Sequence, residues 1–265
     1  MGNLIFCEFA KLKRRKLLLA AALCAVVMPA LFGFYFVATS DSLDEMSIQT
    51  MFDPCISMGG MVVLVPLLAV LASNLLFAEN DNDTLKNLLT VPIAPGMLVL
   101  AKLLVLLLFS VVYMLVGFAF SFVFTLCIHG TVDGWLLQLG AAVFSAFLFW
   151  AAAMPCVLLV VWLNKSYIIS VIATFAYTVA NYLLSSSPFL MQPYGLNPGT
   201  LLPSCIITRW YYPLHGAPTE PGLYMDFYNK FSPYFVSAPQ CFAVLALEAA
   251  VCLLLITRVY KRHAL

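Results

Sequence analysis

The sequence predicts an all-α membrane protein with six transmembrane helices. Hydrophobic residues make up 63% of the 265-residue chain and charged residues only 9%, whereas about a quarter of the residues in a soluble domain are charged. Six apolar segments match the length of about 20 residues that a helix needs to cross a bilayer. They lack the alternation of a membrane barrel, so helices are the expected spanning structure. The expected spans are residues 17–37, 56–77, 101–128, 135–163, 167–184 and 235–256.

Basic residues predict how these spans are oriented. One cluster of lysines and arginines, at residues 11–16, precedes the first span, and another, at residues 258–262, follows the last. Lys86, Lys102 and Lys165 fall on the same side if the chain crosses the membrane six times. The more basic side of a membrane protein faces the cytoplasm. We therefore expect a multi-pass membrane protein with both termini in the cytoplasm.

The stretch before the first span has the pattern of an amphipathic helix. Ile5, Phe9 and Leu12 share one helical face, whereas Glu8 and Lys11 point the other way. This arrangement predicts a helix that lies on the inner leaflet of the bilayer. The alternative, which the residues leave open, is a solvated charge cluster that only orients the chain.

The polar segment between the second and third spans is predicted to form a short cytoplasmic helix. Asp83 can cap a helix in which Leu85, Leu88 and Leu89 share one face. Pro92 ends this helix, because the residue before a proline avoids the α conformation. This is the polar segment best placed for a cytoplasmic partner to bind.

Residues 185–235, between the fifth and sixth spans, are rich in proline and aromatic side chains. Such a segment is too aromatic to be disordered, so it predicts a small ordered cap on the outer surface. Residues 200–207 are apolar but too short to span, which indicates a re-entrant or interfacial piece. Trp210, Tyr211 and Tyr212 are candidate contacts for an amphiphilic ligand. The alternative is an aromatic belt that anchors the cap at the membrane interface.

Few polar residues lie within the spans. Glu248 is in the sixth span, where an ionisable group usually faces the bundle interior or water. It either assists substrate passage or is protonated and hydrogen-bonded across helices. Asn74, near the inner end of the second span, is a substrate-path candidate with an interhelical hydrogen bond as its alternative. Cys55 and Cys205 are both expected outside, where either free thiols or a disulfide would be compatible.

The sequence lacks the motifs of a self-contained enzyme. It has no GxxxxGK[ST] phosphate loop, no GxSxG elbow and no HExxH pair. His129, His215 and His263 are scattered, and none has a partner at metal-ligand spacing. We therefore expect no catalytic residue, no metal and no cofactor in this chain, and no nucleic-acid partner.

Two motifs resemble the ABC-2 type transporter permeases. They are Glu8-Phe-Ala-Lys-Leu-Lys-Arg14, before the first span, and Glu79-Asn-Asp-Asn-Asp-Thr-Leu-Lys-Asn-Leu-Leu-Thr-Val-Pro92, after the second, with Ala101-Lys102 opening the third. The branch most similar is that of the lantibiotic-immunity and bacitracin-resistance permeases of Gram-positive bacteria. Members often have glycine before the threonine of the second motif, where this chain has Asp83.

The resemblance implies one transmembrane domain, residues 1–265, with an elbow helix at 1–16, a coupling segment at 79–96 and an extracellular cap at 185–235. It implies a second permease, either the same chain or a paralogue, and a dimer of ATPase subunits that bind ATP and Mg²⁺. The substrate implied is an amphiphilic peptide antibiotic, whose export from the lipid bilayer or outer surface gives immunity or antibiotic resistance. The implied elbow residues are Glu8, Phe9, Lys11, Leu12, Lys13 and Arg14. The implied ATPase-coupling residues are Glu79, Asp81, Asp83, Thr84, Leu85, Lys86, Leu88 and Leu89.

Two other classes of function compete with an exporter. A motor-independent secondary transporter or channel for a small amphiphile would need several intramembrane charges or discontinuous helices near the midplane. Glu248 is the candidate that the sequence offers for such a charge. An intramembrane enzyme would need clustered acidic or histidine side chains, and the sequence does not place such residues together.

Overall fold

Helices make up most of the part of the chain that the computed structural model describes. The described residues are residue 6 and residues 16–39, 46–81, 95–163, 167–185, 188–217 and 222–264. These residues contain one isolated β-bridge, between Ser47 and Thr131, and no strand. The expected all-α class is therefore confirmed.

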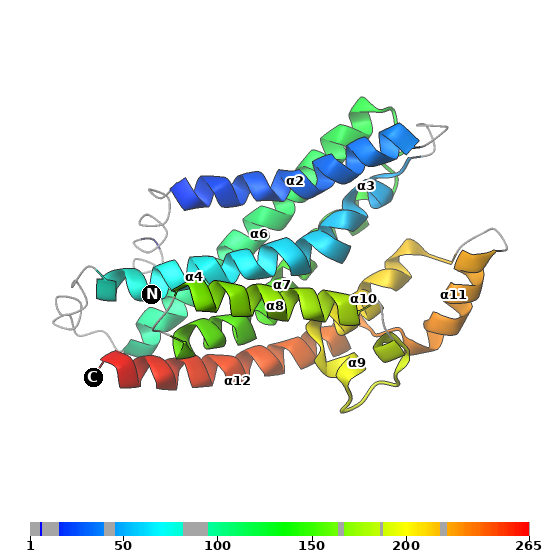
Figure 1. Ribbon diagram of the computed structural model, residues 1–265. Helices are drawn as coiled ribbons and strands as arrows, with labels where there is room; N and C mark the ends of the chain where they lie inside the picture. Colours follow the sequence, from blue (N-terminus) through cyan, green and yellow to red (C-terminus); the bar gives the residue numbers. More distant parts are fainter. Residues whose placement is uncertain are drawn as a thin grey trace.

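The described residues form six long helical runs that lie side by side in an elongated bundle (Figure 1). Successive runs alternate in direction, so that α2 begins and α12 ends at the left of Figure 1. The second run is continuous through three elements, α3, η1 and α4. The bounds are α2 (Lys16–Thr39), α3 (Ile48–Pro54), η1 (Cys55–Leu64), α4 (Val65–Asp81), α6 (Pro95–Cys127), α7 (Trp135–Trp162), α8 (Tyr167–Leu184) and α12 (Ala238–Ala264).

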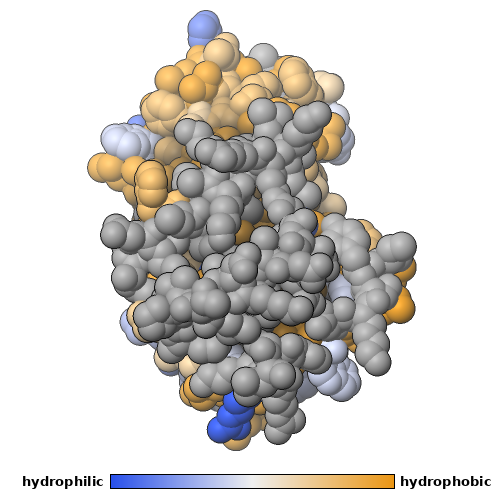
Figure 2. Space-filling view, turned by 90° about the vertical axis from the view of Figure 1, so that its left-hand side faces the viewer, coloured by the Kyte–Doolittle hydropathy of each residue, from blue (hydrophilic) through white to orange (hydrophobic). Residues whose placement is uncertain are grey.

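Four of these runs, judged on the described residues, are long and apolar enough to cross a membrane. Two further stretches, in α2 and α8, are apolar but shorter. Many large hydrophobic side chains face outward, such as Trp162, which is 70% exposed. Figure 2 views the bundle from the end where α2 begins, and most of the described atoms visible from this side belong to hydrophobic residues. The long stretches are Ile48–Leu76, Gly96–Cys127, Trp135–Trp162 and Ala238–Val259, and the shorter ones are Leu23–Thr39 and Ile169–Leu184.

Helices α6 and α7 pack together in the core of the bundle. Ser110 of α6 donates a hydrogen bond of 2.8 Å to the carbonyl of Ala146 in α7. The indole of Trp150 in α7 donates one of 2.9 Å to the carbonyl of Leu103 in α6. Lys102 of α6 is also buried, and its ammonium group donates to a backbone carbonyl of α4. Such interhelical hydrogen bonds help to hold the helices together, because helices in lipid have no hydrophobic driving force to associate.

The second run begins at Ile48, eight positions before the expected start of the second span at residue 56. Pro54 lies within this run, although a proline removes a backbone donor and its ring crowds the preceding turn. The helix widens directly after Pro54 into a π-helix of ten residues, η1. A widened turn relieves that crowding, and π segments are frequent at functional sites. Within η1, a Cβ on Gly60 would lie 2.1 Å from the ring of Phe149, so glycine permits this close approach to α7.

Between α8 and α12 the chain forms a group of short helices at the right of Figure 1. Helix α10 packs against α7, α8 and α12. Arg209 of α10 is only 1% exposed. Its guanidinium donates hydrogen bonds to the carbonyls of Tyr234, at 2.6 Å, and Gly199, at 3.0 Å. The bounds are α9 (Pro198–Leu201), α10 (Pro203–Tyr211), η3 (Tyr212–His215), α11 (Leu223–Phe231) and η4 (Ser232–Tyr234).

Candidate functional site

Two cavities lie where the short helices meet the start of the second run. The first has a volume of about 570 Å³ and the second about 620 Å³. Ser57, Thr208 and Tyr212 line both cavities, so the two adjoin. We call the first the Asp53 cavity, because Asp53 lines it, and the second the Phe227 cavity, after the ring of Phe227 in its wall.

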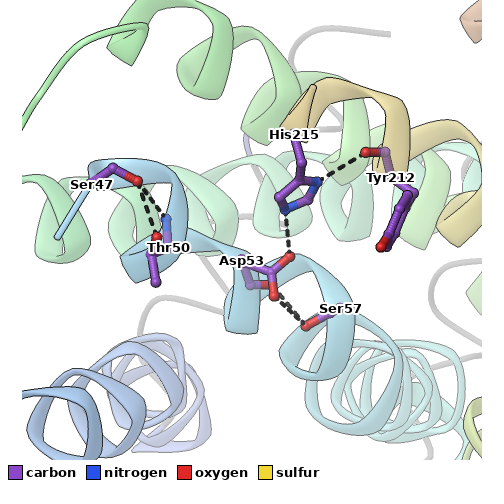
Figure 3. Close-up of polar contacts among 6 residues, drawn as sticks. All are labelled: Ser47, Thr50, Asp53, Ser57, Tyr212 and His215. Atoms are coloured by element: carbon purple, nitrogen blue, oxygen red, sulfur yellow. Dashed lines mark hydrogen bonds and ion pairs between the residues drawn. The ribbon is translucent and has the colours of Figure 1, made fainter. Parts of the chain in front are cut away.

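An ion pair between Asp53 and His215 lies in the wall of the Asp53 cavity (Figure 3). The Nε2 atom of His215 is 3.0 Å from Asp53 Oδ1, and Nδ1 is 3.2 Å from the carbonyl oxygen of Tyr212. A carbonyl can only accept, so Nδ1 carries a proton, and a carboxylate at Nε2 favours a second proton there. Burial lowers the pKa of His215, but the hydrogen bond to Asp53, the charge of Asp53 and the backbone hydrogen bonds together outweigh it and raise this pKa above the ordinary value.

Local sequence explains how both partners are positioned. In the second run, Ser57 donates a hydrogen bond of 2.9 Å to the backbone carbonyl of Asp53, one turn earlier. On the other side, Pro213 lies in the first turn of the short helix η3, where its missing N–H costs nothing. Gly216 follows with φ of +74°, a left-handed conformation that suits glycine and ends the turn directly after His215.

Tyr211 presents a buried hydroxyl group at the same cavity. The residue is 4% exposed, and among the described residues its hydroxyl has no hydrogen-bond partner. Burial raises the pKa of Tyr211 well above its ordinary value, and the charge of Asp53 raises this pKa further. The hydroxyl therefore keeps its proton at neutral pH. Its ring packs edge-on against His215, with the ring centroids 4.8 Å apart.

Tyr212 joins the cavities to an aromatic cluster in the short helices. The centroid of its ring lies 5.3 Å from that of the Phe231 ring and 5.7 Å from that of the Phe227 ring, and both pairs have edge-to-face geometry. Phe231 is fully buried and also contacts Phe235, at 5.2 Å. Such pairs add stabilisation beyond the area that they bury. The cluster therefore forms a rigid apolar wall beside the polar groups of the Asp53 cavity.

The expected substrate-path residues fall in different places. Tyr211 and Tyr212 line the cavities, but Trp210 packs in the core against Phe144, with ring centroids 4.8 Å apart. Asn74 donates a hydrogen bond of 3.0 Å within its own helix, to the carbonyl of Val70.

Glu248 lies in α12, half-buried, and is not among the residues that line either cavity. It is close enough to interact electrostatically with the hydroxyl of Tyr177 in α8. Cys55 and Cys205 are both buried free thiols, so the disulfide alternative is not realised.

The motifs at the ends of the spans are mostly beyond the described part of the chain. Glu79 and Asp81 are in the last turn of α4. Outside the described residues lie the elbow residues Glu8, Phe9, Lys11, Leu12, Lys13 and Arg14 and the coupling residues Asp83, Thr84, Leu85, Lys86, Leu88 and Leu89.

Sequence reasoning missed the Asp53–His215 pair, because its members stand 162 positions apart. Each residue alone has the appearance of a scattered polar residue near a membrane surface, and no spacing rule links them. Among the described residues, no group of three histidine, cysteine or acidic side chains is arranged to hold a metal ion. The cavities thus offer a surface for binding an organic ligand, with aromatic rings and a few fixed polar groups.

Comparison with known proteins bears on the identity of the chain. A search of curated proteins finds no match. A protein-family model described as "ABC-2 family transporter protein" matches residues 4–181, from the segment before α2 to the C-terminal half of α8. The match covers more than half of the chain, and the short helices α9–α11 lie beyond it. The chain therefore belongs to the ABC-2 family of transporter proteins.

Proposed function

We propose that this chain is the permease subunit of an ATP-driven exporter that expels an amphiphilic peptide antibiotic. It would cross the plasma membrane of a Gram-positive bacterium six times, with both termini in the cytoplasm. Its partners would be a second permease and a dimer of ABC ATPase subunits, which bind ATP and Mg²⁺. Membership of the ABC-2 family supports the role of a membrane transport subunit, and the resemblance to antibiotic-resistance permeases supports the substrate.

The observation that carries the proposal is the pair of adjoining cavities. Each has a volume in the range of about 300–1000 Å³ that is typical of small-ligand sites. Their walls combine apolar and aromatic rings with the Asp53–His215 pair. An amphiphile matches such a wall, because its apolar body buries against rings while its polar groups meet the ion pair.

A continuous helical run connects the Asp53 cavity with the proposed ATPase-coupling segment. Residues 48–81 extend from the Asp53 cavity to the start of the coupling segment, roughly 50 Å at 1.5 Å per residue. Closure of the ATPase dimer on nucleotide would push on residues 79–90 and move this run. The π-helix η1 is the irregular part of the run, where a rotation is most easily absorbed. Transport requires that the ligand bind the two end states with different affinity.

The test is a resistance assay in a sensitive bacterium. The chain is expressed together with the ATPase subunit that co-purifies with it, and cells are challenged with bacitracin and with a lantibiotic. We expect resistance that Leu88→Asp abolishes, because a charge replaces an apolar docking residue. The control Asn87→Asp adds the same charge at the neighbouring position and should keep resistance.

Insertion is checked by membrane fractionation, and ATPase docking by co-purification. Undiminished co-purification and resistance in the Leu88→Asp variant would refute the coupling role. Transport driven by an ion gradient in liposomes without any ATPase would refute the exporter and favour a secondary transporter.

A further inference from the structure

We propose that the Asp53 cavity binds the ammonium group of an amphiphile, with the Asp53 carboxylate as counter-ion and tyrosine rings as a surrounding cage. The role of this site in transport rests on the proposed function, but the binding itself needs no ATPase. The cavity wall keeps a carboxylate oxygen available as an acceptor while several of its donors are bonded, and aromatic rings line the same wall.

Several donors of the wall are already bonded inside the protein. The hydroxyl of Ser57 donates to the carbonyl of Asp53 at 2.9 Å, and that of Thr208 donates to the carbonyl of Ser204 at 2.8 Å. A hydroxyl has one proton, so each keeps only lone pairs for a ligand. Both nitrogens of His215 are occupied, by Tyr212 and by Asp53.

An acceptor, in contrast, remains available. Oδ1 of Asp53 is taken by His215, but among the described residues the hydrogen-bonding neighbour of Oδ2 is a distant one, the Ser57 hydroxyl at 3.4 Å. That hydroxyl directs its proton to the backbone carbonyl, so Oδ2 receives little from it. The Asp53 side chain is 38% exposed, so a ligand can reach it. A group that brings several N–H donors is therefore the natural complement of this site.

The hydroxyl of Tyr211 supports the same conclusion independently. Tyr211 lines the cavity, and its buried hydroxyl has no hydrogen-bond partner among the described residues. A buried polar group without a partner is costly, and a ligand that fills the cavity can supply the missing bond. An ammonium group has three donors, enough to bind the carboxylate and this hydroxyl together.

The rings of the cavity favour a cation. Tyr211, Tyr212 and Tyr224 line it from three different elements, and Phe36 of α2 adds a fourth ring. The face of an aromatic ring attracts an ammonium group, more strongly where water is excluded. Among the described residues that line the cavity, the basic one is His215, which already pairs with Asp53, so they offer no free cation to an anionic group. The geometry thus selects an amine over an acid.

The experiment measures binding of octylamine and of octanol, which share one apolar chain and differ in the head group. The full chain is placed in nanodiscs of phosphatidylglycerol, which has no amine, and titrated by calorimetry. We expect one saturable site for octylamine and only lipid partitioning for octanol. Asp53→Asn removes a charged hydrogen-bonding partner and should weaken octylamine binding about ten- to hundred-fold. Asp226→Asn, which removes an exposed acid of α11 outside the cavity, should bind like the wild type.

Two further variants keep the result interpretable if Asp53→Asn perturbs the fold. His215→Gln leaves the carboxylate in place and removes the positive charge that competes for it, so octylamine binding should become tighter. Tyr211→Phe removes only the unpartnered hydroxyl and should weaken binding by a few-fold. Equal affinity for octanol and octylamine, or an Asp53→Asn affinity equal to that of the wild type, would overturn the proposal.

A second arm identifies the source of the amine. In nanodiscs that contain phosphatidylethanolamine, competition with octylamine assigns the site to a lipid head group, and an unchanged affinity assigns it to the amine of a peptide. Both results support an ammonium site. Failure of the Leu88→Asp resistance test would refute the exporter without touching octylamine binding, so the two proposals fail separately.

Discussion

Replacing Arg209 by methionine tests whether one buried guanidinium organises the short helices that form the cavities. The side chain is 1% exposed and donates to two carbonyls, at 2.6 and 3.0 Å, on either side of α10 in the chain. Charge-assisted bonds contribute about 1.5–3 kcal/mol each, so two of them amount to about 3–6 kcal/mol. Burial lowers the pKa of Arg209, which shows that desolvation opposes its charge. Because Arg209→Met also relieves this desolvation, we expect a net loss of about 2–4 kcal/mol.

The assay is hydrogen exchange of the backbone amides in α9, α10 and α11, with the protein in nanodiscs. At about 1.4 kcal/mol per tenfold change, the loss corresponds to exchange about thirty- to thousand-fold faster in these helices. Amides in the α6–α7 core should keep their wild-type rates, because the two guanidinium hydrogen bonds of Arg209 go to Tyr234 and Gly199 and not to these helices. Lys230→Met, an exposed basic residue of α11, is the control and should change little. A change below about threefold in Arg209→Met would refute the idea that the guanidinium holds these helices together.

Two other perturbations follow from the packing and the ion pair. Gly60→Ala places a methyl group 2.1 Å from the Phe149 ring, so overpacking should destabilise the fold by about 1–3 kcal/mol or more, seen as a lower Tm. Gly140→Ala, with nothing within 4 Å, should leave the Tm unchanged or raise it, and Phe149→Leu should recover part of the Gly60→Ala loss. The raised pKa of His215 means that its pair with Asp53 stabilises the fold fully below pH 6.5 and loses this effect as pH rises through the folded-state pKa. The difference in Tm between the wild type and His215→Gln should therefore shrink as pH is raised well above 6.5.

Specific results would contradict the predictions for Gly60→Ala and His215→Gln. A Gly60→Ala protein as stable as Gly140→Ala would mean that η1 and α7 do not approach as closely as the structure has them. A Tm difference for His215→Gln that stays constant or grows with pH would mean that His215 is neutral in the folded protein and that its link to Asp53 is not ionic.

The helices of this protein could be predicted because hydropathy is a local property. Each expected span contains an observed helix, although the described residues confirm only four runs as long and apolar enough to cross a membrane. Length and composition determine this class, since a backbone in lipid must satisfy its own hydrogen bonds. The second run begins eight positions earlier than expected, because the helix that starts at Ile48 continues through Pro54 into the π-helix η1.

The cavity site depends on contacts that no local pattern encodes. The sequence singled out Trp210, Tyr211 and Tyr212 together, but the rotation of α10 buries the first in the core and turns the other two to the cavities. Asp53 meets His215 only because the chain returns, 162 residues later, to the same end of the bundle. The sequence by itself determined that the chain is a membrane-embedded helical protein, because burial in lipid constrains every residue of a span. Only the tertiary structure decided which polar groups come into contact. Helices in lipid associate through the fit of particular side chains and through hydrogen bonds, not through hydrophobicity.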